Sequence, residues 1–185
     1  GDTIPKSMTK ADYAEYRFES ALAEEDDFDM LVMGRTQGKG CYCYVNGVLK
    51  TLLDKYIGAY RYVVIDNEAG MEHIARGTLP HVDALLLVSD CSRRGVQAVA
   101  RIAEMVRELD LKPGLMKLII NRAPGGVLSD GVREEIEAHH LELAGVLPQD
   151  DAVYEADCDG KPSSQVPDNT PVKQALHQIM RDLNL

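Results

Sequence analysis

The sequence contains no long apolar run, no block of basic residues and no tryptophan. A helix needs about 20 consecutive apolar residues to span a bilayer, and no stretch of this chain approaches that length. With a formal net charge of -10, the chain also lacks the cationic surface that binds nucleic acid or anionic lipid. We therefore expect neither nucleic acid nor a membrane among the partners.

Cysteine is scarce as well, with four in 185 residues. Together with the lack of a signal-like start, this number favours a reducing, cytoplasmic location over secretion. The length is typical of one domain, residues 1–185, with enough chain to bury a core. A hydrophobic share of 45% and a charged share of 27% are ordinary for a soluble globular protein.

The common phosphate-binding loop is a further missing feature. No stretch matches the pattern G-x-x-x-x-G-K-[ST]. The one G-x-G, at 38–40, lacks the strand–turn–helix setting and has no Ser or Thr after a Lys. A nucleotide site in this chain would therefore be without its usual phosphate cradle.

Strand and helix patterns alternate along most of the chain. The predicted strands are continuous apolar runs, which are typical of a parallel sheet covered on both faces. The predicted fold class is therefore α/β, with a mostly parallel sheet and helices on both faces. We expect strands at 29–34, 61–66, 83–89, 115–121 and 143–147, and helices at 11–25, 46–60, 94–109, 132–140, 151–156 and 170–183.

Polar residues follow four of the predicted strands. In parallel sheets, ligands bind beyond the carboxyl ends of the strands. We therefore expect these residues to line one active edge of the sheet. They are Gly34, Asp66, Asn121 and the run Pro148-Gln149-Asp150.

The chemistry of these strand ends suits a nucleotide. A carboxylate such as Asp66 can hold Mg²⁺ through water, and Gly70 lets a backbone N–H approach a phosphate closely. Asn121 can bind the edge of an adenine ring while Arg122 stacks on its face. The structural alternatives are that Asp66 caps the next helix and that Asn121 is a turn residue.

Two cysteines, Cys41 and Cys43, lie one residue apart after a glycine-containing loop. In an extended segment, both sulfurs can face one partner, whereas a disulfide between them would be strained. A structural zinc site needs about four ligands, so two copies of the chain related by a two-fold axis could each supply two. The alternative is a turn with two free thiols, because C-x-C lacks the second pair that makes such a pattern specific.

Several of these segments, taken together, resemble the CooC-type accessory ATPases of nickel carbon monoxide dehydrogenase maturation. These proteins belong to the MinD/nitrogenase-iron-protein class of dimeric P-loop ATPases. The resemblance rests on the run GCYC at 40–43 and the run DNEAGMEH at 66–73, with RGT at 76–78 and Asp83 further on. It covers most of the chain.

The resemblance implies a homodimer whose Cys41 and Cys43 bind zinc or nickel between the subunits. It implies that the segment from Asp66 to Gly70 senses the γ-phosphate, with Asp66 in a catalytic role. Asn121 and Arg122, with the loop after residue 147, would hold adenine. ATP with Mg²⁺ would then couple closure of the dimer to nickel delivery, with carbon monoxide dehydrogenase as the client.

Members of that family begin with a strand and a phosphate loop rich in Gly and Lys, and this chain contains neither. The expected fold is therefore a P-loop NTPase-like, Rossmann-like three-layer domain that is N-terminally incomplete. The resemblance implies an ATPase, while the missing loop argues against ATP turnover by this polypeptide alone. Two other functions stay open: an electron carrier like the nitrogenase iron protein, and a non-catalytic MinD/ParA-like binding module.

Overall fold

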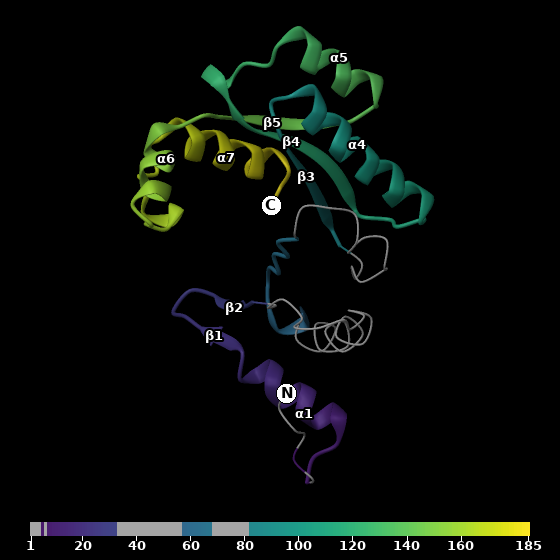
Figure 1. Ribbon diagram of the computed structural model, residues 1–185, viewed down its shortest axis with the longest axis vertical. Helices are drawn as coiled ribbons and strands as arrows, with labels where there is room; N and C mark the ends of the chain where they lie inside the picture. Colours follow the sequence, from purple (N-terminus) through teal and green to yellow (C-terminus); the bar gives the residue numbers. More distant parts are fainter. Residues whose placement is uncertain (1–4, 6, 33–56, 68–81) are drawn as a thin grey trace. The chain divides into compact units, whose positions relative to one another are not determined.

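The computed structural model describes residue 5 and residues 7–32, 57–67 and 82–185 (Figure 1). The chain divides into two compact units, Gly1–Pro80 and His81–Leu185. The predicted single domain over residues 1–185 stays a prediction. Most of the predicted helix at 46–60 lies outside the described residues.

The first unit begins with helix α1 (Lys10–Glu19) and a hairpin of strands β1 (Leu22–Glu24) and β2 (Asp29–Leu31). A capping box starts α1: the Thr9 hydroxyl accepts from the N–H of Asp12 at 3.1 Å, and the Asp12 carboxylate accepts from the N–H of Thr9. The prediction of a helix over 11–25 is thus wrong beyond residue 19. The acidic run at 24–27 ends β1 at Glu24 and continues into the hairpin turn, and β2 is an antiparallel, partly exposed strand rather than a buried one.

The predicted strand at 61–66 is also wrong. Residues 57–59 form the short 3₁₀ helix η1 (Ile57–Ala59), and residues 62–67 have no regular secondary structure. Val63 and Val64 are 42% and 91% exposed. β-branched residues favour a strand only when a neighbouring strand and a packed face are present. Within the described residues, this segment has neither.

The second unit contains a parallel sheet in the order β3–β4–β5. The strands are β3 (Ala84–Asp90), β4 (Leu115–Ala123) and β5 (Leu143–Pro148). The helices are α4 (Arg93–Glu108), α5 (Asp130–Ala138), α6 (Asp151–Cys158) and α7 (Pro171–Asp182), with short 3₁₀ helices η2 (Pro124–Gly126) and η3 (Ser163–Gln165). The predicted α/β class with a parallel sheet is confirmed.

The core of this unit lies between the sheet and helices α4 and α5 (Figure 1). Leu118 and Ile120 of β4 point to this face and are 1% and 0% exposed. Apolar residues on α4 recur at helical spacing, so one stripe of the helix meets the sheet. The other buried members of the cluster are Leu87, Val96, Val99, Ala100, Ala103, Ala123, Leu128, Val132, Ile136 and Leu141.

Helix α7 packs against the opposite face of the sheet, at β5. Gly145 of β5 pairs in register with Ile119 of β4. A Cβ atom at Gly145 would lie 2.6 Å from Cδ1 of Ile179, so the bare glycine backbone makes room for the helix. The sheet therefore has helices on both faces. In the part of the chain that is described, no helix has the length and apolar character needed to cross a bilayer.

Candidate functional site

The carboxyl ends of β3, β4 and β5 meet at one edge of the sheet, and hydrogen bonds join their exit loops. The N–H of Gln149, after β5, donates to the carbonyl of Ala123 at the end of β4, at 2.9 Å. The thiol of Cys91, after β3, donates to the carbonyl of Arg122 at 3.7 Å. The three exits therefore form one connected edge rather than three independent loops.

The β3 exit is organised around Asp90. Its carboxylate accepts hydrogen bonds from the hydroxyl and the backbone N–H of Ser92, at 2.6 and 3.0 Å. These two bonds, with a smaller contribution from the charge of Arg122, hold the pKa of Asp90 below its ordinary value. Ser92 in turn caps α4 by accepting from the N–H of Gly95 at 3.0 Å. An ionised carboxylate is therefore held at this edge.

The β4 exit presents Asn121 and Arg122. Arg122 has a left-handed backbone with φ of 55°, a conformation that costs a non-glycine residue roughly 1 kcal/mol or more. The side-chain oxygen of Asn121 accepts from the N–H of Arg122 at 2.9 Å. Within the described residues, the amide nitrogen of Asn121 has no hydrogen-bond partner. An amide donor and an exposed planar cation thus lie side by side, which suits the edge and the face of a heteroaromatic ring.

The β5 exit is held by the carboxylate of Asp150. One of its oxygens accepts from the N–H of Ala152, at the start of α6, at 3.0 Å. The other oxygen accepts from the N–H of Val172, in the first turn of α7, at 3.3 Å. Two helix N-termini therefore meet at one side chain, directly after the strand. This arrangement fixes the path of residues 148–150 along the edge.

Several solved structures share this arrangement of helices and strands. A solved structure of a ParA-family ATPase from Chlorobium tepidum TLS matches with a TM-score of 0.69 at 17% identity, covering 99% of this chain and 76% of that chain. MinD proteins are among the other solved structures that share the fold. In sequence, the ATP-binding protein MJ0685 of Methanocaldococcus jannaschii is 36% identical over 180 residues, which is 96% of this chain and 70% of that protein. The chain belongs to the family of the ATP-binding protein MJ0685, and it shares the fold of MinD and ParA-family ATPases.

A second relative has a named role. The carbon monoxide dehydrogenase accessory protein CooC of Rhodospirillum rubrum is 32% identical over 133 residues. That match covers 69% of this chain and 48% of CooC, so the chain spans about half the length of that relative. No protein-family model matches the chain.

The described part of the chain brings some of the predicted site residues together. Asn121, Arg122 and residues 148–150 lie at the same edge of the sheet and are joined through the Gln149–Ala123 hydrogen bond. Asp66 belongs to the first unit, where its side chain is exposed. The other predicted residues, Cys41, Cys43, Gly34 and Gly70, lie outside the described residues.

Sequence reasoning missed the β3 exit of this MinD/ParA-like fold. The predicted strand ends at residue 89 and leaves out the polar residues just beyond it. The signal was present: Asp90 and Ser92 follow a buried strand, and Gly95 comes three residues after the serine. Asp, Ser and Gly in this order at a strand-to-helix junction indicate a cap and a close approach of helix to strand.

The described part of the chain contains no metal site. Across residues 5, 7–32, 57–67 and 82–185, no group of three or more His, Cys, Asp or Glu side chains is arranged to hold a metal ion. The two cysteines in this part, Cys91 and Cys158, are free thiols, half-buried and exposed respectively. The predicted thiolate pair, Cys41 and Cys43, lies outside this part of the chain.

Proposed function

We propose that this chain is part of an ATP-dependent, cytoplasmic maturation factor that inserts nickel into carbon monoxide dehydrogenase. The observation that carries the proposal is the likeness to CooC, which is 32% identical over 69% of this chain. The C-x-C pair and the DNEAGMEH run add the residue types that a metal-handling, nucleotide-dependent protein needs.

In this proposal, the base of ATP binds at the exits of β4 and β5. The free amide of Asn121 binds the ring edge, and the guanidinium of Arg122 stacks on the ring face. The hydrogen bonds that join the exit loops support this assignment, because the groups that bind the edge and the face of a flat ring must be held at a fixed spacing. Asp66 would take the catalytic role with Mg²⁺, and the backbone at Gly70 would contact phosphate.

The metal would bind between two copies of the chain. Cys41 and Cys43 supply two thiolates, and thiolates select metals such as zinc or nickel over magnesium. A tetrahedral thiolate site needs about four ligands, so a homodimer completes it. ATP binding and hydrolysis would then open or close the dimer and deliver the ion.

The test is a titration of the chain with Zn²⁺ and Ni²⁺, combined with sedimentation to follow oligomeric state. We expect saturation at about half an ion per chain, with dimers forming as metal is added. The double variant Cys41→Ser with Cys43→Ser should lose both effects. The matched control, Cys91→Ser with Cys158→Ser, removes the same number of thiols and should behave as the wild type.

Three outcomes would count against the shared site. A monomer that binds one ion would show that a single chain completes the coordination sphere. A brown protein with iron and acid-labile sulfide would instead indicate a cluster and an electron carrier. If the cysteine double variant keeps its metal content and its oligomeric state, a non-catalytic binding module becomes the better description.

A further inference from the structure

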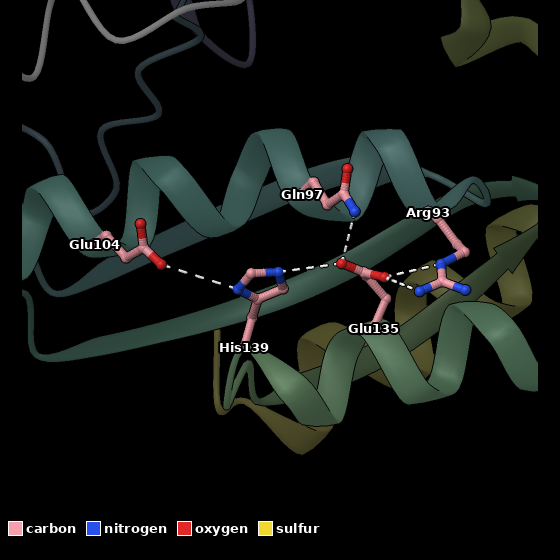
Figure 2. A network of polar contacts seen from close by, with 5 residues as sticks. All are labelled: Arg93, Gln97, Glu104, Glu135 and His139. Atoms are coloured by element: carbon pink, nitrogen blue, oxygen red, sulfur yellow. Dashed lines mark hydrogen bonds and ion pairs between the residues drawn. The ribbon is translucent and has the colours of Figure 1, made fainter.

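Helices α4 and α5 are joined by a network centred on the carboxylate of Glu135 (Figure 2). The Glu135 side chain is only 8% exposed. It accepts a hydrogen bond from Nε2 of Gln97 at 2.8 Å and a forked pair from Arg93, at 2.8 and 2.7 Å. The ring of His139 lies on the other side, 3.2 Å from the carboxylate. The carboxylate is therefore held from two helices at once.

A charge in this position is costly to bury unless it is well partnered. The hydrogen bonds from Gln97 and Arg93 hold the pKa of Glu135 below its ordinary value, so the group is ionised near neutral pH. The forked contact with Arg93 has defined geometry as well as charge, because the guanidinium is planar. The network therefore fixes where the start of α4 lies against α5.

The start of α4 is also the exit of β3. Arg93 is the first residue of the helix and follows Ser92, whose hydroxyl binds the Asp90 carboxylate. Cys91, one residue earlier, donates its thiol to the carbonyl of Arg122. A displacement of Arg93 would therefore move the donor that contacts Arg122.

These contacts close a ring. From Arg122 the chain continues through η2 into α5, which carries Glu135. Glu135 pairs with Arg93 at the start of α4. The β3 exit, which leads into Arg93, contacts the carbonyl of Arg122 through Cys91 and so closes the ring. Arg122 sits in this ring with its left-handed backbone. Strained backbone persists only where the surrounding structure holds it.

We propose that Arg93 and Glu135 are positioning residues for Arg122, and that their ion pair sets the affinity of this edge for a nucleotide base. The proposal rests on the proposed nucleotide site at Asn121 and Arg122. Neither positioning residue touches the ligand: both act through the β3 exit and the backbone of Arg122.

The experiment is a double-mutant cycle on the chain, with ATP as the ligand and inorganic triphosphate as the probe without a base. Glu135→Gln should weaken ATP binding by about tenfold and leave triphosphate binding unchanged. The effect should vanish in the Arg122→Ala background, because the group that Glu135 positions is then absent. Arg93→Lys, which keeps the charge and loses the planar fork, should act in the same way and serves if Glu135→Gln fails to fold.

Glu134→Gln is the matched control, because Glu134 is the exposed neighbour on the same helix. It should change neither affinity. An equal loss from Glu135→Gln with and without Arg122, or an equal loss for triphosphate, would show that the ion pair stabilises the fold only. That result would overturn the positioning role.

A second readout separates this proposal from the proposed function. If the wild-type chain binds no ATP, the nucleotide site is wrong, and amide hydrogen exchange without ligand tests the ring directly. The N–H groups of Arg122 and Gln149 are bonded at 2.9 Å to Asn121 and Ala123, so their exchange reports order at the edge. Glu135→Gln should speed this exchange by about tenfold relative to Glu134→Gln. Unchanged exchange would overturn the coupling itself.

Discussion

Individual residues at the carboxyl edge are selected for backbone geometry as much as for side-chain chemistry. Gly95 lies in the first turn of α4, where alanine would favour the helix by about 1 kcal/mol. A Cβ at this position would nevertheless meet Oγ of Ser89 at 2.5 Å and the Asp90 carboxylate closer still. The close approach of α4 to β3 therefore requires glycine at position 95, and the Asp90–Ser92 contacts depend on that close approach.

Glu135 should make stability depend on pH in a defined direction. Its pKa is lower in the folded chain than the ordinary value of 4.5, chiefly because of Gln97 and Arg93. Its contribution is therefore fully present above that ordinary value and is lost as pH falls through the folded pKa. The ring of His139 lies between this carboxylate, at 3.2 Å, and the Glu104 carboxylate, at 3.9 Å.

We therefore expect Glu135→Gln to lower the urea midpoint at neutral pH. The difference from the wild type should shrink as pH falls below 4.5 and through the lower folded pKa, where the wild-type carboxyl becomes uncharged as well. Glu134→Gln should show no comparable pH dependence. A Glu135→Gln difference that persists unchanged into acid would show that lost packing, rather than lost charge, is responsible.

At the scale of elements, the sequence predicted the second unit well and the first unit poorly. Strands β3, β4 and β5 agree with the predicted 83–89, 115–121 and 143–147 within two residues at each end. Each is a continuous apolar run that pairs with another such run, so the local pattern and the tertiary contacts agree. The run at 61–66 has the same pattern, but its described neighbours offer no strand to pair with.

Only part of the candidate site was predictable from the sequence. Asn121, Arg122 and residues 148–150 were predicted because they lie at the ends of recognisable strands. The contacts that hold these residues in place were not predictable. The pairing of Arg93 with Glu135 joins residues 42 apart in sequence, and no local pattern indicates it. The first-unit hairpin was missed because its acidic turn continues the polar side of a helical pattern.

Helix α7 depends on one buried side chain. Ile179 is 4% exposed and packs over Gly145, whereas Leu176 on the same helix is 38% exposed. Ile179→Ala should therefore destabilise the chain by roughly 2–5 kcal/mol, through lost burial and the cavity left beside β5. Leu176→Ala should cost less than about 1 kcal/mol. Urea unfolding of both variants checks the difference, and similar losses for the two would contradict this packing.

At the scale of the whole molecule, the net charge of -10 bears on the proposed dimer. Two such chains repel each other, and salt screens that repulsion. With metal present, the dimer dissociation constant should therefore fall between about 20 and about 200 mM salt, as measured by sedimentation. A dimer that weakens with added salt would instead indicate an interface held by opposite charges.

The carboxylate of Asp150 begins α6 and also anchors the first turn of α7, 22 residues further along the chain. The start of the last helix is therefore set by a side chain at the end of β5 and not only by the residues that lead into it. We therefore expect the exposed part of the segment between the two helices to vary in length and sequence among relatives of this protein, provided that the shared acid and the buried Val166 are kept.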